Sequence, residues 1–241
     1  MGSAFAGAKA GIIGGIFFAG SLGIFNYLLL VLLKPSVLAA LAKTPECSGV
    51  VPSGTAQPVE DCFTAIVAVL IPLSAFIVFI LSLVFAIIYG KFFESYPGRD
   101  YRVRALIVSY LMLVFLLLFG LEGIFVDEPQ RLAIVAFDAV ATGVYAYLLG
   151  KFYKRYTRVI EFSSPEPEPI KIMIGRKNVT GKTLTFSTRS SHKVVARASE
   201  KTVFREWSYS GGVTVEDPNS FETIMRVDGD GMLKATSAHP S

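Results

Sequence analysis

The first 150 residues alternate between long apolar runs and short polar segments. The apolar runs cover about residues 10–33, 63–90, 105–126 and 132–150. A membrane-spanning helix needs roughly 20 mostly apolar residues, and each run has about that length. The pattern therefore predicts an all-α transmembrane domain over residues 1–158, built as a four-helix bundle.

The pattern changes after the fourth run. Residues 159–169 are rich in Pro and Glu, which predicts an extended linker. From residue 170 to 241, short β-prone runs alternate with turn signals, including a predicted hairpin turn at 228–231. This spacing predicts a small soluble all-β domain, a sandwich or a barrel, with Trp207 in its core.

Composition agrees with a membrane protein. Of the 241 residues, 52% are hydrophobic and 17% are charged, whereas soluble proteins carry roughly 25% charged residues. The net charge of +4 comes largely from basic residues at the ends of apolar runs, so it does not indicate a nucleic-acid partner. The expected surroundings are the lipid bilayer.

The distribution of basic residues predicts the orientation. They gather between the second and third runs and after the fourth: Lys91, Arg99, Arg102, Arg104, Lys151, Lys154, Arg155 and Arg158. Short loops rich in Lys and Arg stay in the cytoplasm. We therefore expect a multi-pass protein of the cell membrane with both termini cytoplasmic, and with the loop 34–62 and the turn 127–130 outside.

The two cysteines, Cys47 and Cys62, both lie in the predicted outside loop. A short shared loop in an oxidising compartment favours a disulfide bond between them. Such a bond would stabilise the fold by roughly 3 kcal/mol in the chain-entropy model. The alternative is a pair of free thiols.

Two segments resemble each other at the ends of the second and fourth runs. Residues 90–96 and 150–156 both begin with Gly, Lys and two aromatic residues. This similarity favours two tandem helical hairpins. Alternatively, it reflects the Gly, Lys and aromatic residues that are common where helices end at a cytoplasmic interface. The surrounding aromatics predict an interfacial belt: Tyr89, Phe92, Phe93, Tyr96, Tyr101, Phe152, Tyr153 and Tyr156.

The first apolar run carries a strip of small residues spaced four apart. Its members are Gly7, Gly11, Gly15, Ala19 and Gly23. This spacing places them on one helix face, where backbones can approach closely. The strip predicts packing inside the bundle or, alternatively, an oligomer interface or a pore-lining face.

Two acidic residues interrupt the later apolar runs. Asp138 lies inside the fourth run, and Glu122 lies near the outer end of the third. Ionisable groups inside a membrane are costly and are commonly functional. Two nearby carboxyl groups could share a proton and form a proton or cation site. Alternatively, a protonated Asp138 bonds to another helix, or Asp138 pairs with Arg131.

The chain shows no catalytic constellation, no nucleotide loop and no set of metal-ligand spacings, so we expect no enzymatic activity, metal or cofactor. The first hypothesis is a membrane scaffold or accessory subunit that associates with itself or with another membrane protein. Its β-domain would be the cytoplasmic binding module. The alternative is a small oligomeric channel or a proton- or cation-linked transporter that uses Asp138 and Glu122.

Overall fold

The computed structural model describes residues 3–43, 47, 59–97, 100–118, 128–164, 170–198 and 202–238. The chain divides into two compact units. One unit is helical and contains Ala10–Ala86 and Arg102–Gly150. The other combines a β-sheet with the ends of several helices, and it contains Met1–Lys9, Ile87–Tyr101 and Lys151–Ser241.

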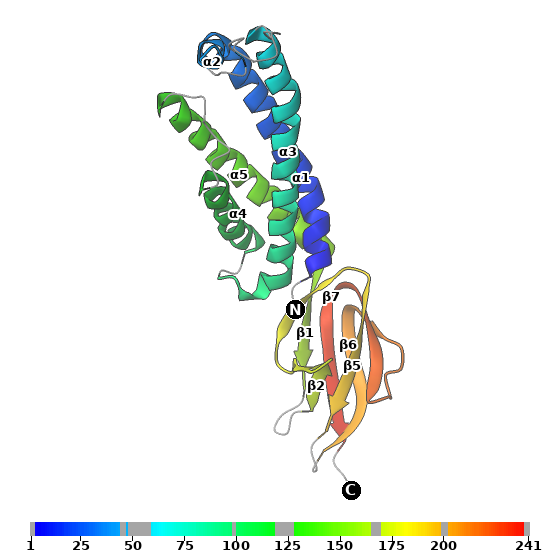
Figure 1. The fold of residues 1–241 in the computed structure, drawn as a ribbon. Helices are drawn as coiled ribbons and strands as arrows, with labels where there is room; N and C mark the ends of the chain where they lie inside the picture. Colours follow the sequence, from blue (N-terminus) through cyan, green and yellow to red (C-terminus); the bar gives the residue numbers. More distant parts are fainter. Residues whose placement is uncertain are drawn as a thin grey trace. The chain divides into compact units, whose positions relative to one another are not determined.

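Over the described residues, the apolar part of the chain forms five α-helices (Figure 1). They are α1 (Ala4–Leu32), α2 (Lys34–Leu41), α3 (Val59–Phe92), α4 (Tyr101–Leu118) and α5 (Glu128–Tyr156), and a 3₁₀ turn, Phe93–Ser95, follows α3. Three described segments are long and apolar enough to cross a membrane: Ala4–Leu32, Val59–Lys91 and Ile134–Tyr156. The expected third span, 105–126, coincides with α4 as far as Leu118, and 119–127 lie outside the described residues. The count of four spans therefore stays a prediction.

Helical structure extends into the expected outside loop 34–62. Its first part is the short helix α2, and α3 begins at Val59. Pro35 lies in the first turn of α2, where its missing N–H costs nothing. Glu60 and Asp61 lie in the first turn of α3, where acidic side chains stabilise the helix by interacting with the positive end of its dipole.

The C-terminal strands belong to one curled mixed sheet that forms a half-barrel (Figure 1). They are β1 (Thr157–Ser163), β2 (Lys171–Ile174), β3 (Lys177–Asn178), β4 (Thr183–Ser187), β5 (Ser190–Arg197), β6 (Val203–Val215) and β7 (Glu222–Ala238). The order is β3-β2-β5-β7-β1-β4, and β6 pairs with β7. β1 runs parallel to β7, and the other pairs are antiparallel. The β-rich prediction is confirmed, but these strands form a single sheet where a two-layer sandwich or a barrel was expected.

The sheet has its own hydrophobic core. Side chains from β1, β2, β5, β6 and β7 are almost completely buried together, among them Phe162, Met225 and Leu233. Trp207 belongs to this cluster, as predicted, and its indole N–H donates a hydrogen bond of 2.9 Å to the carbonyl of Ser220.

The expected linker 159–169 is corrected by β1. This strand begins at Thr157, directly after α5 ends at Tyr156, and it lies between β7 and β4. Ile160 and Phe162 are buried on either side of exposed Glu161, which is the alternation of a half-buried strand. The β-sheet therefore begins at residue 157, well before residue 170. Residues 165–169 lie outside the described residues.

The hairpin turn predicted at 228–231 is wrong, because β7 runs through it without a break. The glycines serve close packing between strands: a Cβ on Gly212 would meet the backbone of Gly229, and a Cβ on Gly211 would lie 2.9 Å from the Cα of Gly231. Asp230 has a different role, since its Oδ1 accepts a hydrogen bond of 2.8 Å from the N–H of Val159 on β1.

Candidate functional site

The small-residue strip of α1 faces α3. A Cβ added to Gly11 would lie 2.5 Å from the Cβ of Ala86, and one added to Gly15 would meet the hydroxyl of Ser82. At Gly23 the corresponding distance to the Cβ of Ala75 is 3.6 Å. As the numbers on α1 rise, those on α3 fall, which is the register of two antiparallel helices.

The same register continues to the N-terminal end of the strip. A Cβ added to Gly90 would lie 2.9 Å from the Cα of Gly7. Ala19, the remaining member, is buried. These contacts use the strip for packing within the chain, so an oligomer interface or a pore along it would require α3 to move away.

Tyr145 on α5 contacts both α1 and α3 where these two helices pack together. Its ring lies 5.2 Å from the ring of Phe18 and against Gly14 on α1. Its hydroxyl donates a 2.6 Å hydrogen bond to the carbonyl oxygen of Ser82 on α3. One side chain, which the sequence analysis did not single out, therefore connects three helices. The sequence offered two tyrosines in this apolar run, Tyr145 and Tyr147, and a buried Tyr needs a partner for its hydroxyl. Only the structure shows that Tyr145 is the buried one.

Asp138 lies two turns from Tyr145 on the same face of α5. It is 4% exposed, and Thr142, between them, is completely buried. Burial of a carboxyl group within an apolar helix is costly unless the group is neutral or engaged by a neighbour. Glu122 and the side chain of Arg131 lie outside the described residues, so the predicted pairings of Asp138 with them stay predictions.

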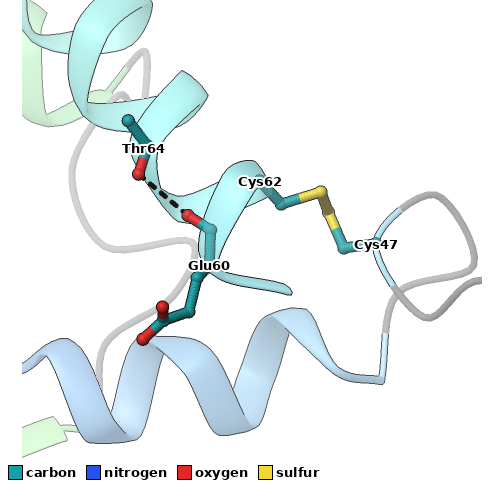
Figure 2. The surroundings of a disulfide bond; sticks show 4 residues. All are labelled: Cys47, Glu60, Cys62 and Thr64. Atoms are coloured by element: carbon teal, nitrogen blue, oxygen red, sulfur yellow. Dashed lines mark hydrogen bonds between the residues drawn. A yellow bond between two sulfur atoms is a disulfide. The ribbon is translucent and has the colours of Figure 1, made fainter. Parts of the chain in front are cut away.

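The predicted disulfide between Cys47 and Cys62 is present (Figure 2). Their Cα atoms are 6.0 Å apart, and Cys62 lies in the first turns of α3. Nearby, the hydroxyl of Thr64 donates a hydrogen bond to the carbonyl of Glu60, one turn earlier in the same helix. Both cysteines pack in a small cluster with Val37, Leu41 and Phe63. The bond therefore connects the segment after α2 to α3 over a packed apolar contact.

Some of the predicted interfacial aromatics form an internal cluster instead. Tyr89, Phe93 and Tyr153 are almost completely buried, with ring centroids 4.8 to 5.5 Å apart. The hydroxyl of Tyr89 donates a hydrogen bond to the carbonyl of Tyr101, and that of Tyr153 to the carbonyl of Gly90. Phe93 and Tyr153 hold matching positions in the two echoed segments, and the structure brings them into contact. The belt prediction is corrected for these residues, while Phe92 is exposed as expected.

Helix ends and the sheet contact each other within one compact unit. The carboxylate of Glu94 accepts a 2.9 Å hydrogen bond from the N–H of Thr185 on β4. The hydroxyls of Ser3 and Ser187 are also in contact, and the N–H of Thr188 donates to the carbonyl of Tyr156. The sheet is therefore attached to the helix ends by direct contacts as well as by the chain.

Among the described strands, β6 pairs with β7 alone, which leaves one of its sides at the edge of the sheet. Between two register shifts, residues 206–211 keep a regular register with β7. The backbone N–H of Trp207 donates a hydrogen bond to the carbonyl of Pro218. Val203 and Tyr209 on this strand have largely exposed side chains.

Comparison of the chain with protein-family models, with curated proteins and with solved structures finds no match.

Over the described part of the chain, no group of three or more His, Cys, Asp or Glu side chains is arranged to hold a metal ion. The features that remain are the buried Asp138 in the helical unit and, in the other unit, the β6 edge and a group of basic side chains near the start of α1.

Proposed function

We propose that this protein is a non-enzymatic multi-pass membrane protein that acts as a scaffold or accessory subunit, with its β-unit as a cytoplasmic binding module. The observation that carries the proposal is the edge of β6. An edge strand presents backbone donors and acceptors to which an extended segment of another protein can add. Exposed Val203 and Tyr209 give such a segment apolar contacts beside the backbone hydrogen bonds.

The attachment of the sheet to the helix ends supports the same proposal. α5 leads into β1 without intervening residues, and Glu94 and Ser3 contact β4. Contacts of this kind keep the sheet, and any partner bound to it, beside the ends of these helices. A flexible tether would not restrict the partner's position in this manner.

Site-specific crosslinking tests this proposal. A photoreactive phenylalanine analogue placed at Tyr209 in the full chain, in its native membrane, should give a discrete higher-mass adduct after irradiation. The same analogue at Lys171, an exposed position on β2, is the matched control and should give none. Equal adducts at both positions, or none at Tyr209, would contradict a binding module at β6.

The proposed orientation has its own test. A single cysteine placed at Ser241, in a chain whose native cysteines are replaced by Ser, should resist a membrane-impermeant thiol reagent in intact cells. One placed at Ser53 should react. Reaction at position 241 from outside would reverse the proposed topology.

The burial of Asp138 favours a second candidate function, a small channel or a proton- or cation-linked transporter that uses Asp138 and Glu122. In that case Asp138→Asn and Asp138→Leu should both abolish ion flux into vesicles while the protein still folds, and Asp138→Glu should keep part of it. If Asp138 instead bonds to another helix, Asp138→Asn should change stability by about 1 kcal/mol, and Asp138→Leu should cost more. Wild-type vesicles no leakier than empty ones would exclude the transport function.

A further inference from the structure

A basic cavity lies within the β-containing unit. Its volume is about 310 Å³, and three segments line it: the first turns of α1, the junction between α5 and β1, and the turn between β4 and β5. Among the described residues, the lining includes the cationic side chains Lys9, Arg155, Arg158 and Arg189 and no carboxylate. The volume falls within the usual range of ligand pockets, about 300–1,000 Å³.

Over the described residues, no carboxylate compensates the positive charge of this cavity. None of its four cations forms an ion pair with a carboxylate of the described residues. Lys and Arg side chains that no carboxylate engages can form charge-assisted hydrogen bonds with an anionic ligand.

The side chains of Lys9 and Arg158 are positioned by contacts with aromatic rings and backbone carbonyls, which do not neutralise their positive charge. The ammonium of Lys9 lies 4.5 Å from the ring centroid of Phe5 and 5.8 Å from that of Tyr156. Arg158 donates to the carbonyls of Arg155 and Thr157 and keeps further donors for a ligand. Arg189 adopts φ of +58°, a left-handed conformation that costs a non-glycine residue about 1 kcal/mol. This conformation belongs to the tight two-residue turn between β4 and β5, which fixes the position of Arg189 at the cavity.

The face of α1 that carries Lys9 indicates which anion fits. Phe5, Lys9, Ile12 and Ile16 follow one another at helical spacing, so they share this face. Phe5 and Ile16 are 65% and 59% exposed, on a helix long and apolar enough to cross a membrane. A cation above an exposed apolar stripe matches a phospholipid, whose phosphate and acyl chains lie in the same order.

We propose that this cavity binds the phosphate-bearing headgroup of an anionic phospholipid of the adjoining leaflet. Lys9, Arg155 and Arg189 supply the positive charge. The acyl chains lie along the exposed face of α1. The site is independent of the β6 edge and of any transport through the helices.

The test uses the purified full chain in neutral detergent and measures lipid retained per protein by native mass spectrometry, together with thermal stability. The probes are phosphatidylglycerol, zwitterionic phosphatidylcholine, and the soluble anions inorganic phosphate and glycerol phosphate. The site variant is Lys9→Gln/Arg155→Gln/Arg189→Asn, in which Asn tolerates the left-handed backbone. The matched control is Lys171→Gln/Arg176→Gln/Arg197→Gln, which removes the same charge from exposed positions of the same unit.

The control positions lie away from the cavity. Arg197 is at the other end of β5 from Ser190, about 23 Å along the strand at 3.3 Å per residue. Lys171 pairs with Arg197, and Arg176 is in the turn that follows β2. Fluorescence of buried Trp207 verifies that each variant is folded, and Arg189→Asn alone provides a milder variant if the triple variant unfolds.

Wild-type protein and the control should retain and be stabilised by phosphatidylglycerol in preference to phosphatidylcholine. The site variant should bind phosphatidylglycerol about tenfold or more weakly, since each basic residue contributes about 1 kcal/mol to binding an anionic lipid surface. Equal losses in both triple variants would indicate general surface attraction and overturn the proposal. No preference of the wild type for the anionic lipid, or equal stabilisation by glycerol phosphate, would also overturn it.

Discussion

Gly15 has almost no space beside it, because the hydroxyl of Ser82 occupies the position that a side chain would need. Gly15→Val should therefore force α1 and α3 apart and cost about 1–3 kcal/mol, the usual penalty of overpacking. Gly20, on the same helix, has no atom within 4 Å of an added Cβ. Gly20→Val is the matched control and should change thermal stability in detergent little. Equal losses in both variants would attribute the effect to helix propensity and not to the contact with α3.

We expect the stability of the sheet to depend on pH because of His192. Its ring lies 4.7 Å from that of Phe186, and burial lowers the pKa of His192 below its usual 6.5. The unfolded chain therefore binds this proton at a higher pH than the folded chain does. The free energy of unfolding should fall as the pH drops below about 6.5, and no such loss should occur above it.

His192→Gln removes the titrating group and keeps a polar side chain beside Ser190. The thermal midpoint of this variant should fall less than that of the wild type between about pH 7.5 and about pH 5.5, because the unfolded state no longer gains the extra proton. An identical decrease in both proteins would assign the acid sensitivity to other groups.

At the scale of elements, the disulfide joins the segment after α2 to the start of α3. The cysteines are 15 residues apart, so removing the bond should cost about 3 kcal/mol in the chain-entropy model. Cys47→Ser, Cys62→Ser and the double variant should lose the same amount, because either change breaks the one bond. Thermal unfolding measures this, and additive losses from the two single variants would contradict a shared bond.

At the scale of the whole molecule, β1 is part of the β-sheet, so a fragment that folds by itself should begin at residue 157. Ile160 and Phe162 are completely buried in a core whose members lie on the strands or, like Ile170 and Val179, directly beside them. A fragment of residues 157–241 should therefore give a β-type circular dichroism spectrum and a shielded Trp207. A fragment of residues 170–241 should not, since it lacks the strand between β7 and β4. Folding of the shorter fragment would show that β1 is dispensable.

Local properties of the sequence were sufficient for part of this architecture. Long apolar runs specified helices because length and hydropathy act within one segment, and two cysteines in one short loop left a single pairing. Trp207 could be placed in the core for the same reason, since a large apolar side chain in a β-prone run is normally buried.

Other features depended on which distant segments meet, and only the tertiary structure decided them. β1 is a strand because it pairs with β7, about 70 residues further along the chain, although its neighbour in sequence is a Pro/Glu segment. The glycines at 229 and 231 permit close approach of β6, which a local turn pattern cannot distinguish from a hairpin. The basic cavity likewise joins residues near position 9, near 155 and near 189, because side chains scattered along the chain acquire a common function only when packing brings their segments together.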